Sequence, residues 1–285
     1  DLVRSRGLGD VYKRQVFMVL TAMFMCGCTS DKNTVGQSTE YNGRGGRTPA
    51  ETAFLTDGKE KVCYGQGYET DSDNRPVGAV QAQEKYGSYG GRFIFGKDDR
   101  TIRLTFDEGY ENGCTGKILD ILKEKKVTAT FYVTLDYVKS SPELVQRMIN
   151  EGHEVGNHSC THPSLPDISD DMVFEEIHGL ETYISDNFGG YKTVTMRPPR
   201  GEFSVRTLRI AKNMGYDTVL WSFAYNDWNT DAQPDRDTAY RRITSATHNG
   251  AVYLLHAVSE TNTAILPDII DYWLDNGYTV KSISG

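Results

Sequence analysis

From residue 96 to the C-terminus, short runs of β-branched, aromatic and aliphatic residues alternate with longer runs that repeat apolar side chains at helical spacing. This alternation is typical of a parallel sheet covered by helices. Seven strand–helix units in one stretch favour a barrel over an open sheet, although periodicity alone leaves closure open. The predicted strands span residues 101–106, 127–134, 153–157, 193–196, 216–221, 251–255 and 278–283.

The helical runs carry start and stop signals. A serine stands at the start of three predicted helices, where its hydroxyl can cap the free N–H groups of the first turn. A glycine ends each of them, because glycine readily adopts the left-handed backbone of a helix end. The three pairs are Ser141 with Gly152, Ser169 with Gly189, and Ser204 with Gly215.

The first 28 residues have the pattern of an export signal. Basic residues precede an apolar run over residues 16–25, which is too short to span a bilayer comfortably, and Cys28 follows a glycine. This resembles a bacterial lipoprotein signal with Cys28 lipidated, while an ordinary cleaved signal or an uncleaved anchor remain alternatives. Each alternative exports the chain, so we expect an extracytoplasmic protein that meets the membrane only through an N-terminal anchor.

Two further regions precede the main domain. Residues 29–67 are rich in Ser, Thr, Asn and Gly and have almost no apolar periodicity, which predicts a disordered linker. Residues 68–95 are predicted to form an N-terminal extension with a short helix over 81–85, packed on the outside of the barrel. Residues 96–285 then form one catalytic domain, because 285 residues suffice for one sizeable core.

Charge and composition narrow the class of partner. The formal net charge is -8 at pH 7, whereas a nucleic-acid-binding surface concentrates positive charge. We therefore expect no nucleic-acid partner and a neutral or mildly charged glycan as substrate. We also expect a monomer, although the charge itself does not fix the oligomeric state.

Three cysteines lie beyond the predicted signal, and an odd number cannot all pair. Cys114 and Cys160 each lie close to a candidate active-site motif, so a disulfide between them is one alternative. Two free thiols are the favoured prediction.

Unusual polar residues follow five of the predicted strands. In a barrel the carboxyl ends of the strands form one active face, so these residues should meet. Singly, each has a simpler explanation: surface carboxylates, chance histidine spacing, a strand-end ion pair, a loop anchor, or a core histidine. Their convergence is what favours catalysis. The groups are Asp107-Glu108, His158 with His162, Arg197, Asp227-Trp228, and His256.

The metal-binding candidates are Glu108, His158 and His162. Two imidazoles and a carboxylate can hold one divalent metal ion and leave positions open for water and substrate. This donor set suits zinc first, and also cobalt or manganese. Such a metal would lower the pKa of water towards neutrality.

The remaining polar residues suit acid–base chemistry. Asp107 could accept a proton from water, and Arg197 would keep it ionised. His256 could protonate a departing amine, and Asp227 would hold that imidazole in one tautomer and raise its pKa.

The motifs are similar in order to those of the NodB-type polysaccharide deacetylases, carbohydrate esterase family four. Thr105-Phe106-Asp107-Glu108-Gly109 resembles the family's Thr-Phe-Asp-Asp-Gly. The resemblance implies a distorted, TIM-like (β/α)7 barrel and metal-dependent removal of acetyl groups from N-acetylated sugars. The other four matches are His158 and His162 to His-x-x-x-His, Arg197-Pro198-Pro199 to Arg-x-Pro, and Asp227-Trp228 and Leu254-Leu255-His256 to the last two motifs.

A narrower resemblance points to the muramic-acid de-N-acetylases that lead to the δ-lactam of spore-cortex peptidoglycan. It implies a peptidoglycan glycan strand that has lost its peptide as substrate, a spore-forming source, and a muramoyl amidase that acts first. We expect Tyr110, Asn112, Arg200 and Trp228 to bind this substrate. The likeness lies in Gly109-Tyr110-Glu111-Asn112-Gly113, in residues 221–228, and in residues 254–259 with Asn262.

The chain departs from the wider family at two positions. Glu108 stands where the family has an aspartate ligand, so its side chain is one methylene longer. Arg200 replaces a residue that is often tyrosine, and its charge would favour the acidic lactyl group of muramic acid. Two alternatives remain: a deacetylase of N-acetylglucosamine or chitooligosaccharides, and a catalytically silent glycan-binding protein.

Overall fold

The computed structural model describes residues 58–285, which belong to one compact unit. The predicted export signal, lipidation at Cys28 and most of the predicted linker lie outside the described residues. None of the helices in the described part is long and apolar enough to cross a membrane.

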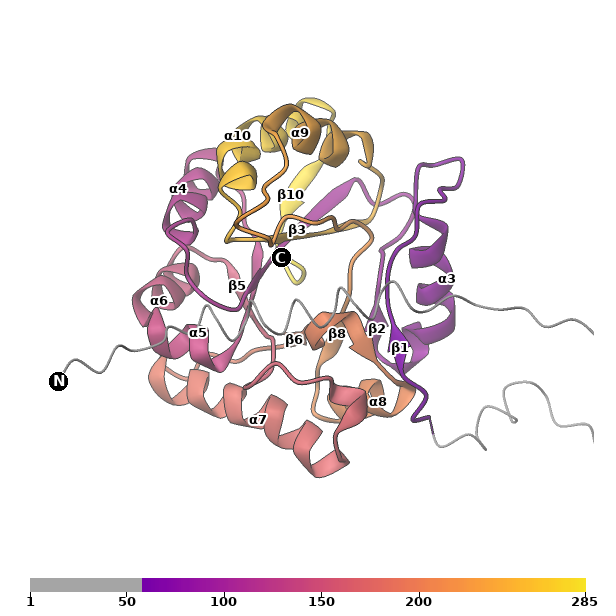
Figure 1. Ribbon diagram of the computed structural model, residues 1–285, viewed down its shortest axis with the longest axis vertical. Helices are drawn as coiled ribbons and strands as arrows, with labels where there is room; N and C mark the ends of the chain where they lie inside the picture. The colour runs from indigo at the N-terminus through magenta and orange to yellow at the C-terminus, as the bar shows by residue number, and fades with distance from the viewer. Residues whose placement is uncertain (1–57) are drawn as a thin grey trace, which may run out of the picture. The chain divides into compact units, whose positions relative to one another are not determined.

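An all-parallel sheet forms the centre of this unit (Figure 1). All seven predicted strands are present, each within two or three residues of its expected bounds. The sheet order is β10-β3-β4-β5-β6-β8-β2, and β9 pairs with β3. The strands are β2 (Gly91–Arg92), β3 (Thr101–Glu108), β4 (Thr130–Val133), β5 (Glu154–Asn157), β6 (Thr195–Met196), β8 (Asp217–Val219), β9 (Ala251–His256) and β10 (Thr279–Lys281).

The sheet curls because β3 pairs along both of its edges. One edge pairs with β9, and the other pairs with β10 at its start and with β4 at its end. The segment after β8 then bridges to β9 through Phe223 and Tyr253, with Leu254 N–H donating to the Phe223 carbonyl at 2.8 Å. The expected distorted (β/α)7 barrel is confirmed.

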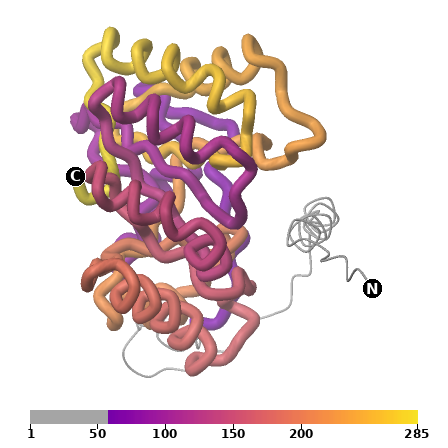
Figure 2. The backbone as a smooth tube through the Cα atoms, turned by 90° about the vertical axis from the view of Figure 1, so that its left-hand side faces the viewer, coloured from indigo at the N-terminus to yellow at the C-terminus, as the bar shows by residue number. Residues whose placement is uncertain are grey.

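Helices cover the outside of the curled sheet, and α10 packs between α4 and α9 (Figure 2). Two of the three predicted serine caps form: Ser169 accepts from the Met172 N–H, and Ser204 makes a reciprocal capping box with Thr207. Ser141 begins α6 without a side-chain cap bond, so the third predicted cap is wrong. The helices are α4 (Thr115–Lys125), α5 (Leu135–Ser140), α6 (Pro142–Asn150), α7 (Asp170–Asn187), α8 (Val205–Asn213), α9 (Arg236–Ser245) and α10 (Glu260–Asp275).

The predicted linker boundary at residue 67 is wrong. Residues 62 and 63 form β1 (Val62–Cys63), which pairs antiparallel with β7 (Glu202–Phe203). Tyr64 is buried in a cluster with Phe93 and Phe203. This segment was not predicted because the residues before it are polar. Its few apolar side chains contact residues that are distant in the sequence.

The N-terminal extension also contains more regular structure than predicted, including a strand of the central sheet. Its helix α3 (Val77–Tyr86) is twice as long as expected, and a 3-10 turn, η1 (Gly87–Tyr89), follows it. Strand β2 then pairs parallel with β8, so the extension supplies the last strand of the sheet.

None of the three cysteines in the described part of the chain is in a disulfide, as the sequence favoured. Among the described residues Cys63 is exposed, Cys114 is buried and Cys160 is intermediate, and none forms a disulfide.

Gly156 on β5 is expected to be intolerant of a side chain. A Cβ atom there would lie 2.5 Å from the ring of Tyr132 and 3.3 Å from the Thr195 carbonyl oxygen. Both neighbours are buried, so Gly156→Ala should lower the free energy of unfolding by about 1–3 kcal/mol, the usual cost of overpacking a core. Urea unfolding measures this change.

Gly116 on α4 is the matched control, since its Cβ would meet only Leu144 at 4.0 Å. Gly116→Ala should leave stability unchanged or raise it by up to about 1 kcal/mol, because alanine favours the helix. Equal unfolding midpoints for the two variants would contradict the predicted crowding at Gly156.

Candidate active site

Strand register brings the predicted site residues together at the carboxyl ends of the strands. Asp107 on β3 lies directly opposite His256, the last residue of β9. Asn157 of β5 pairs with Met196 of β6, so His158 and Arg197, the next residues of each chain segment, are neighbours. Five distant segments of sequence therefore meet at one face, as the strand-end argument predicted.

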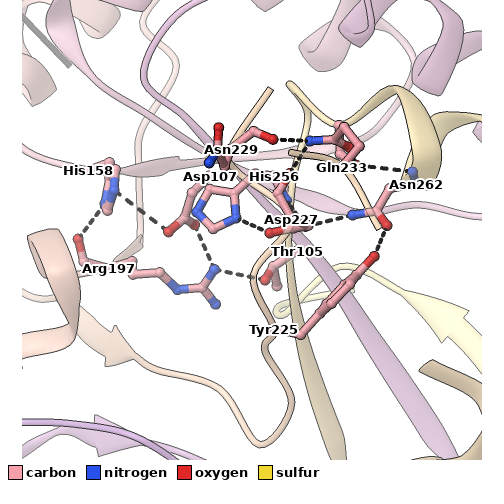
Figure 3. A network of polar contacts seen from close by, with 11 residues as sticks. Thr105, Asp107, His158, Arg197, Tyr225, Asp227, Asn229, Gln233, His256 and Asn262 are labelled. Carbon is pink, nitrogen blue, oxygen red and sulfur yellow. Dashed lines mark hydrogen bonds and ion pairs between the residues drawn. The ribbon is translucent and has the colours of Figure 1, made fainter. Parts of the chain in front are cut away.

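Arg197 is fully buried, and each of its three guanidinium nitrogens has a hydrogen-bond acceptor. Figure 3 shows the contacts with Asp107 and Thr105. Its Nη1 donates to Asp107 Oδ1 at 2.7 Å and to Thr105 Oγ1 at 2.8 Å. Its Nε and Nη2 donate to the carbonyls of Val219 and Leu220, each at 3.1 Å. These four bonds compensate for the removal of the guanidinium from water.

This ion pair keeps Asp107 ionised. Burial alone would raise the pKa of Asp107, but the positive charge of Arg197 and smaller effects of His158 and His256 outweigh it, so the pKa lies below its ordinary value. Only Oδ1 is engaged by Arg197, and Oδ2 faces His158. Asp107 therefore has the charge and the free oxygen that a general base requires.

The two predicted histidine ligands lie beside Asp107. His158 Nδ1 donates to the Arg197 carbonyl at 2.8 Å, which leaves a lone pair on Nε2, 3.6 Å from Asp107 Oδ2. The His158 and His162 ring centroids are 4.9 Å apart. Burial lowers the pKa of His158, and burial with the charges of His158 and Arg200 lowers the pKa of His162 to about 3. Both imidazoles are thus in the neutral form that binds metal.

These features fit a divalent metal ion in donor type. His158 has its outer nitrogen fixed by a backbone carbonyl, which is the usual support of a metal-binding imidazole. Within residues 58–285, however, no three His, Cys, Asp or Glu side chains stand together as a ready metal site. The three-residue set expected from the sequence is not assembled.

Glu108 is the residue that does not join the two histidines. Successive side chains on a strand point to opposite faces, so Glu108 is directed away from the Asp107 side of β3. It is fully buried, with Oε1 3.5 Å from Thr115 Oγ1, and Oε2 has no hydrogen-bond partner among the described residues. Burial, Glu111 and Asp107 raise its pKa well above the ordinary value, which favours the protonated acid.

His256 and Asp227 form the second charged pair of the site. His256 Nδ1 donates to Asp227 Oδ1 at 2.7 Å, and the His256 backbone N–H donates to Oδ2 at 2.8 Å. Burial would lower the pKa of His256, but Asp227, with help from Asp107, raises it above its ordinary value. With Nδ1 held, the proton that can be transferred is on Nε2.

The predicted substrate-binding residues differ in exposure and in the contacts that they make. Tyr110 and Trp228 are half-buried, and Arg200 is exposed. Arg200 lies near enough to His162 for its charge to lower the pKa of that imidazole. Asn112 has a structural bond instead: its amide donates to the Val258 carbonyl at 3.1 Å and ties the loop after β3 to the loop after β9.

The histidine loop and the Arg200 turn have a strained backbone. Ser159, His162 and Arg200, which lies on the 3-10 turn η3 (Pro199–Gly201), have φ values of 68°, 59° and 62°. Left-handed backbone at non-glycine residues is uncommon and collects at functional sites. The strain therefore supports the assignment of this edge as functional.

Sequence reasoning missed the residues that orient the predicted ones. Thr105 contacts Arg197, and the Tyr132 ring lies 4.3 Å from the Arg197 guanidinium carbon. The sequence did contain a signal for Thr105: it lies two residues before Asp107 on β3, so the two side chains point to the same face of the strand. Three more, Tyr225, Gln233 and Asn262, lie around Asp227 (Figure 3).

Comparisons with known proteins agree with this geometry. The polysaccharide deacetylase family profile matches residues 96–219. The peptidoglycan-N-acetylmuramic acid deacetylase PdaA of Bacillus subtilis is 42% identical over 200 residues, which are 70% of this chain and 75% of the relative.

Solved structures show the same likeness. The structure of B. subtilis PdaA, a family 4 carbohydrate esterase, aligns with a TM-score of 0.75 and 38% identity, covering 79% of this chain and 96% of that one. A family 4 carbohydrate esterase from Bacillus anthracis aligns with a TM-score of 0.66 at 38% identity, covering 79% and 95%. The chain belongs to the polysaccharide deacetylases, carbohydrate esterase family 4, which hydrolyse the acetamide bonds of N-acetylated sugars.

Proposed function

We propose that this protein removes the acetyl group of N-acetylmuramic acid in peptidoglycan glycan strands. The observation that carries the chemistry is the presence of two charged pairs, Arg197 with Asp107 and Asp227 with His256. The pairs are neighbours because Asp107 on β3 lies opposite His256 on the adjacent strand β9. The muramic substrate is supported by the 42% identity to a relative named for it.

The reaction follows from the two protonation states. Ionised Asp107 accepts a proton from a water molecule, whose oxygen then bonds to the acetyl carbon. Protonated His256 gives its Nε2 proton to the amide nitrogen as the carbon–nitrogen bond breaks. Acetate and a free sugar amine result, while Arg197 and Asp227 hold the base and the acid in place.

His158 and His162 are the residues that would hold a divalent ion, with zinc the first expectation and cobalt or manganese alternatives. Such an ion, when bound, polarises the acetyl carbonyl and lowers the pKa of water. Glu108 contributes no ligand in its observed position.

The cellular setting follows from the substrate. Peptidoglycan lies outside the cytoplasmic membrane, so the chain acts extracytoplasmically, with the export segment and Cys28 as its means of transport and anchoring. A role in the spore-cortex δ-lactam pathway requires a muramoyl amidase to remove the peptide first.

The decisive measurement is acetate release on peptide-stripped peptidoglycan, intact peptidoglycan and chitooligosaccharides, with and without chelator. Release confined to the stripped strand and lost on chelation is expected. Release from chitooligosaccharides would instead indicate an N-acetylglucosamine deacetylase, and no release from any substrate would indicate a silent glycan-binding protein.

Asp107→Asn should abolish turnover while glycan binding remains. The substitution preserves shape but removes the charge that accepts a proton, so kcat should fall by at least about 10²-fold. Asp186→Asn, which changes an exposed carboxylate on helix α7, serves as the control with unchanged kcat. Equal acetate release by Asp107→Asn and the unaltered protein would remove Asp107 as the base.

Asp227→Asn should displace the pH profile of kcat/KM and also lower its maximum. His256 must be protonated to act, and the charge of Asp227 raises its pKa. The alkaline limb of the profile should therefore move to lower pH, and kcat should fall by about 10²- to 10⁴-fold, as for other imidazoles that lose their carboxylate. An unmoved alkaline limb would mean that His256 is not the acid.

Arg200→Ala should discriminate against the lactyl group. If the exposed guanidinium binds the lactyl carboxylate, KM for the muramic substrate should rise by about 10- to 100-fold, the value of a charge-assisted hydrogen bond. KM for chitooligosaccharides, which lack this carboxylate, should not change. Arg209→Ala on α8 is the control, and equal effects of the two variants would reject the proposed contact.

A further inference from the structure

A chain of directed hydrogen bonds lies behind the His256–Asp227 pair and is not part of the acid–base step itself (Figure 3). The amide nitrogen of Asn262 on α10 donates to Asp227 Oδ2 at 2.6 Å. The hydroxyl of Tyr225 bonds to Asn262 Oδ1. All three of Tyr225, Asp227 and Asn262 are at least nine-tenths buried.

The direction of each bond in this chain is determined. A carboxylate only accepts, so the nitrogen of Asn262 must face Asp227 and its oxygen must face Tyr225. Tyr225 must then donate, and burial raises its pKa so that the hydroxyl keeps its proton. A flipped amide would place two acceptors against each other, so the buried network has one stable polarity.

Both oxygens of Asp227 consequently accept hydrogen bonds that fix the orientation of the carboxylate. Oδ2 accepts from Asn262 and from the backbone N–H of His256, and Oδ1 is left for His256 Nδ1. A rotation of the carboxyl group would break all three bonds. The proton on His256 is thus assigned to Nδ1 by groups that do not touch the reacting atoms.

A second set of bonds fixes the loop that carries Asp227. The side-chain nitrogen of Gln233 donates to the carbonyls of Asp227 at 3.0 Å and Asn229 at 2.7 Å, and its oxygen accepts from Ser259 Oγ at 2.5 Å. Ser259 is also the N-cap of α10. The start of α10 therefore holds both the loop and the carboxylate.

We infer that Asn262 and Tyr225 are positioning residues, which fix the tautomer of His256 and orient its Nε2 for proton transfer by holding Asp227 in one rotamer. This inference rests on the proposed function for its catalytic consequence only. The state of the imidazole is a property of the protein alone and can be measured without substrate.

Other charged groups also face His256 and stay constant in the test. They are Asp107 from β3, Arg197 from the end of β6, and His158 and His162 from the segment after β5. A change in His256 on altering Tyr225 or Asn262 must therefore be transmitted through Asp227.

The test is ¹⁵N NMR of the histidine-labelled full chain, with the His256 signals assigned by their loss in His256→Gln. The variants are Asn262→Leu, which removes the amide at similar size, and Tyr225→Phe, which removes only a hydroxyl. Both should add the Nε2–H tautomer to the neutral form of His256. Both should also lower kcat/KM by about 10- to 100-fold, the usual loss for an outer partner of a functional imidazole, mainly through kcat.

Matched controls separate positioning from stability. Thr263→Val removes a buried hydroxyl one residue further along α10, which bonds only to the Ser259 carbonyl at 2.8 Å. Tyr253→Phe removes a buried hydroxyl that donates to the Ile243 carbonyl at 3.0 Å. Neither control should change the His256 tautomer, whatever its effect on the unfolding midpoint.

The outcomes are distinct. Unchanged His256 signals and kcat in Tyr225→Phe would overturn the inference even if Asn262→Leu failed to fold. Changed signals in the two controls as well would also overturn it. If the unaltered protein released no acetate, the proposed function would fall, while the His256 signals would still decide whether Tyr225 and Asn262 position this imidazole.

Discussion

The buried ion pair of Arg197 and Asp107 is the interaction on which the site depends. A guanidinium removed from water is stable only with all of its donors satisfied. Here the acceptors come from Asp107 and Thr105 on β3 and from the Val219 and Leu220 carbonyls at the end of β8. Loss of either side chain of the ion pair would leave a buried charge without its counter-ion, and loss of the carbonyls would leave buried N–H groups without acceptors. The same bonds that keep the proposed base ionised therefore also hold the strand ends together.

The pair formed by His256, the proposed acid, and Asp227 follows the same principle, except that the supporting residue is an anion instead of a cation. Asp227 is the buried anion, and its acceptor positions are filled by His256 and Asn262. The proposed base and the proposed acid therefore each have a buried partner of opposite charge, and further side chains hold each partner in place. Preorganisation of this kind avoids the cost of reorienting dipoles during the reaction.

Glu108 shows how a familiar motif can differ in three dimensions. The residue follows Asp107 directly, yet strand alternation and the longer side chain place its carboxyl group against Thr115 and Glu111. Burial favours its protonated form, and a protonated acid is a poor metal ligand. His158 and His162 are consequently the two ligands that we propose, and Oδ2 of Asp107 lies 3.6 Å from His158 Nε2.

The sequence by itself determined the seven strands, the capped helices and the strand-end residues, because periodicity, caps and turns are local properties of the chain. Tertiary structure alone decided which way Glu108 faces, that Val62–Cys63 joins the fold, and that Tyr225 and Asn262 hold Asp227. These features depend on contacts between residues far apart in the chain. Such contacts leave no periodic trace in the sequence, so only the packed structure reveals them.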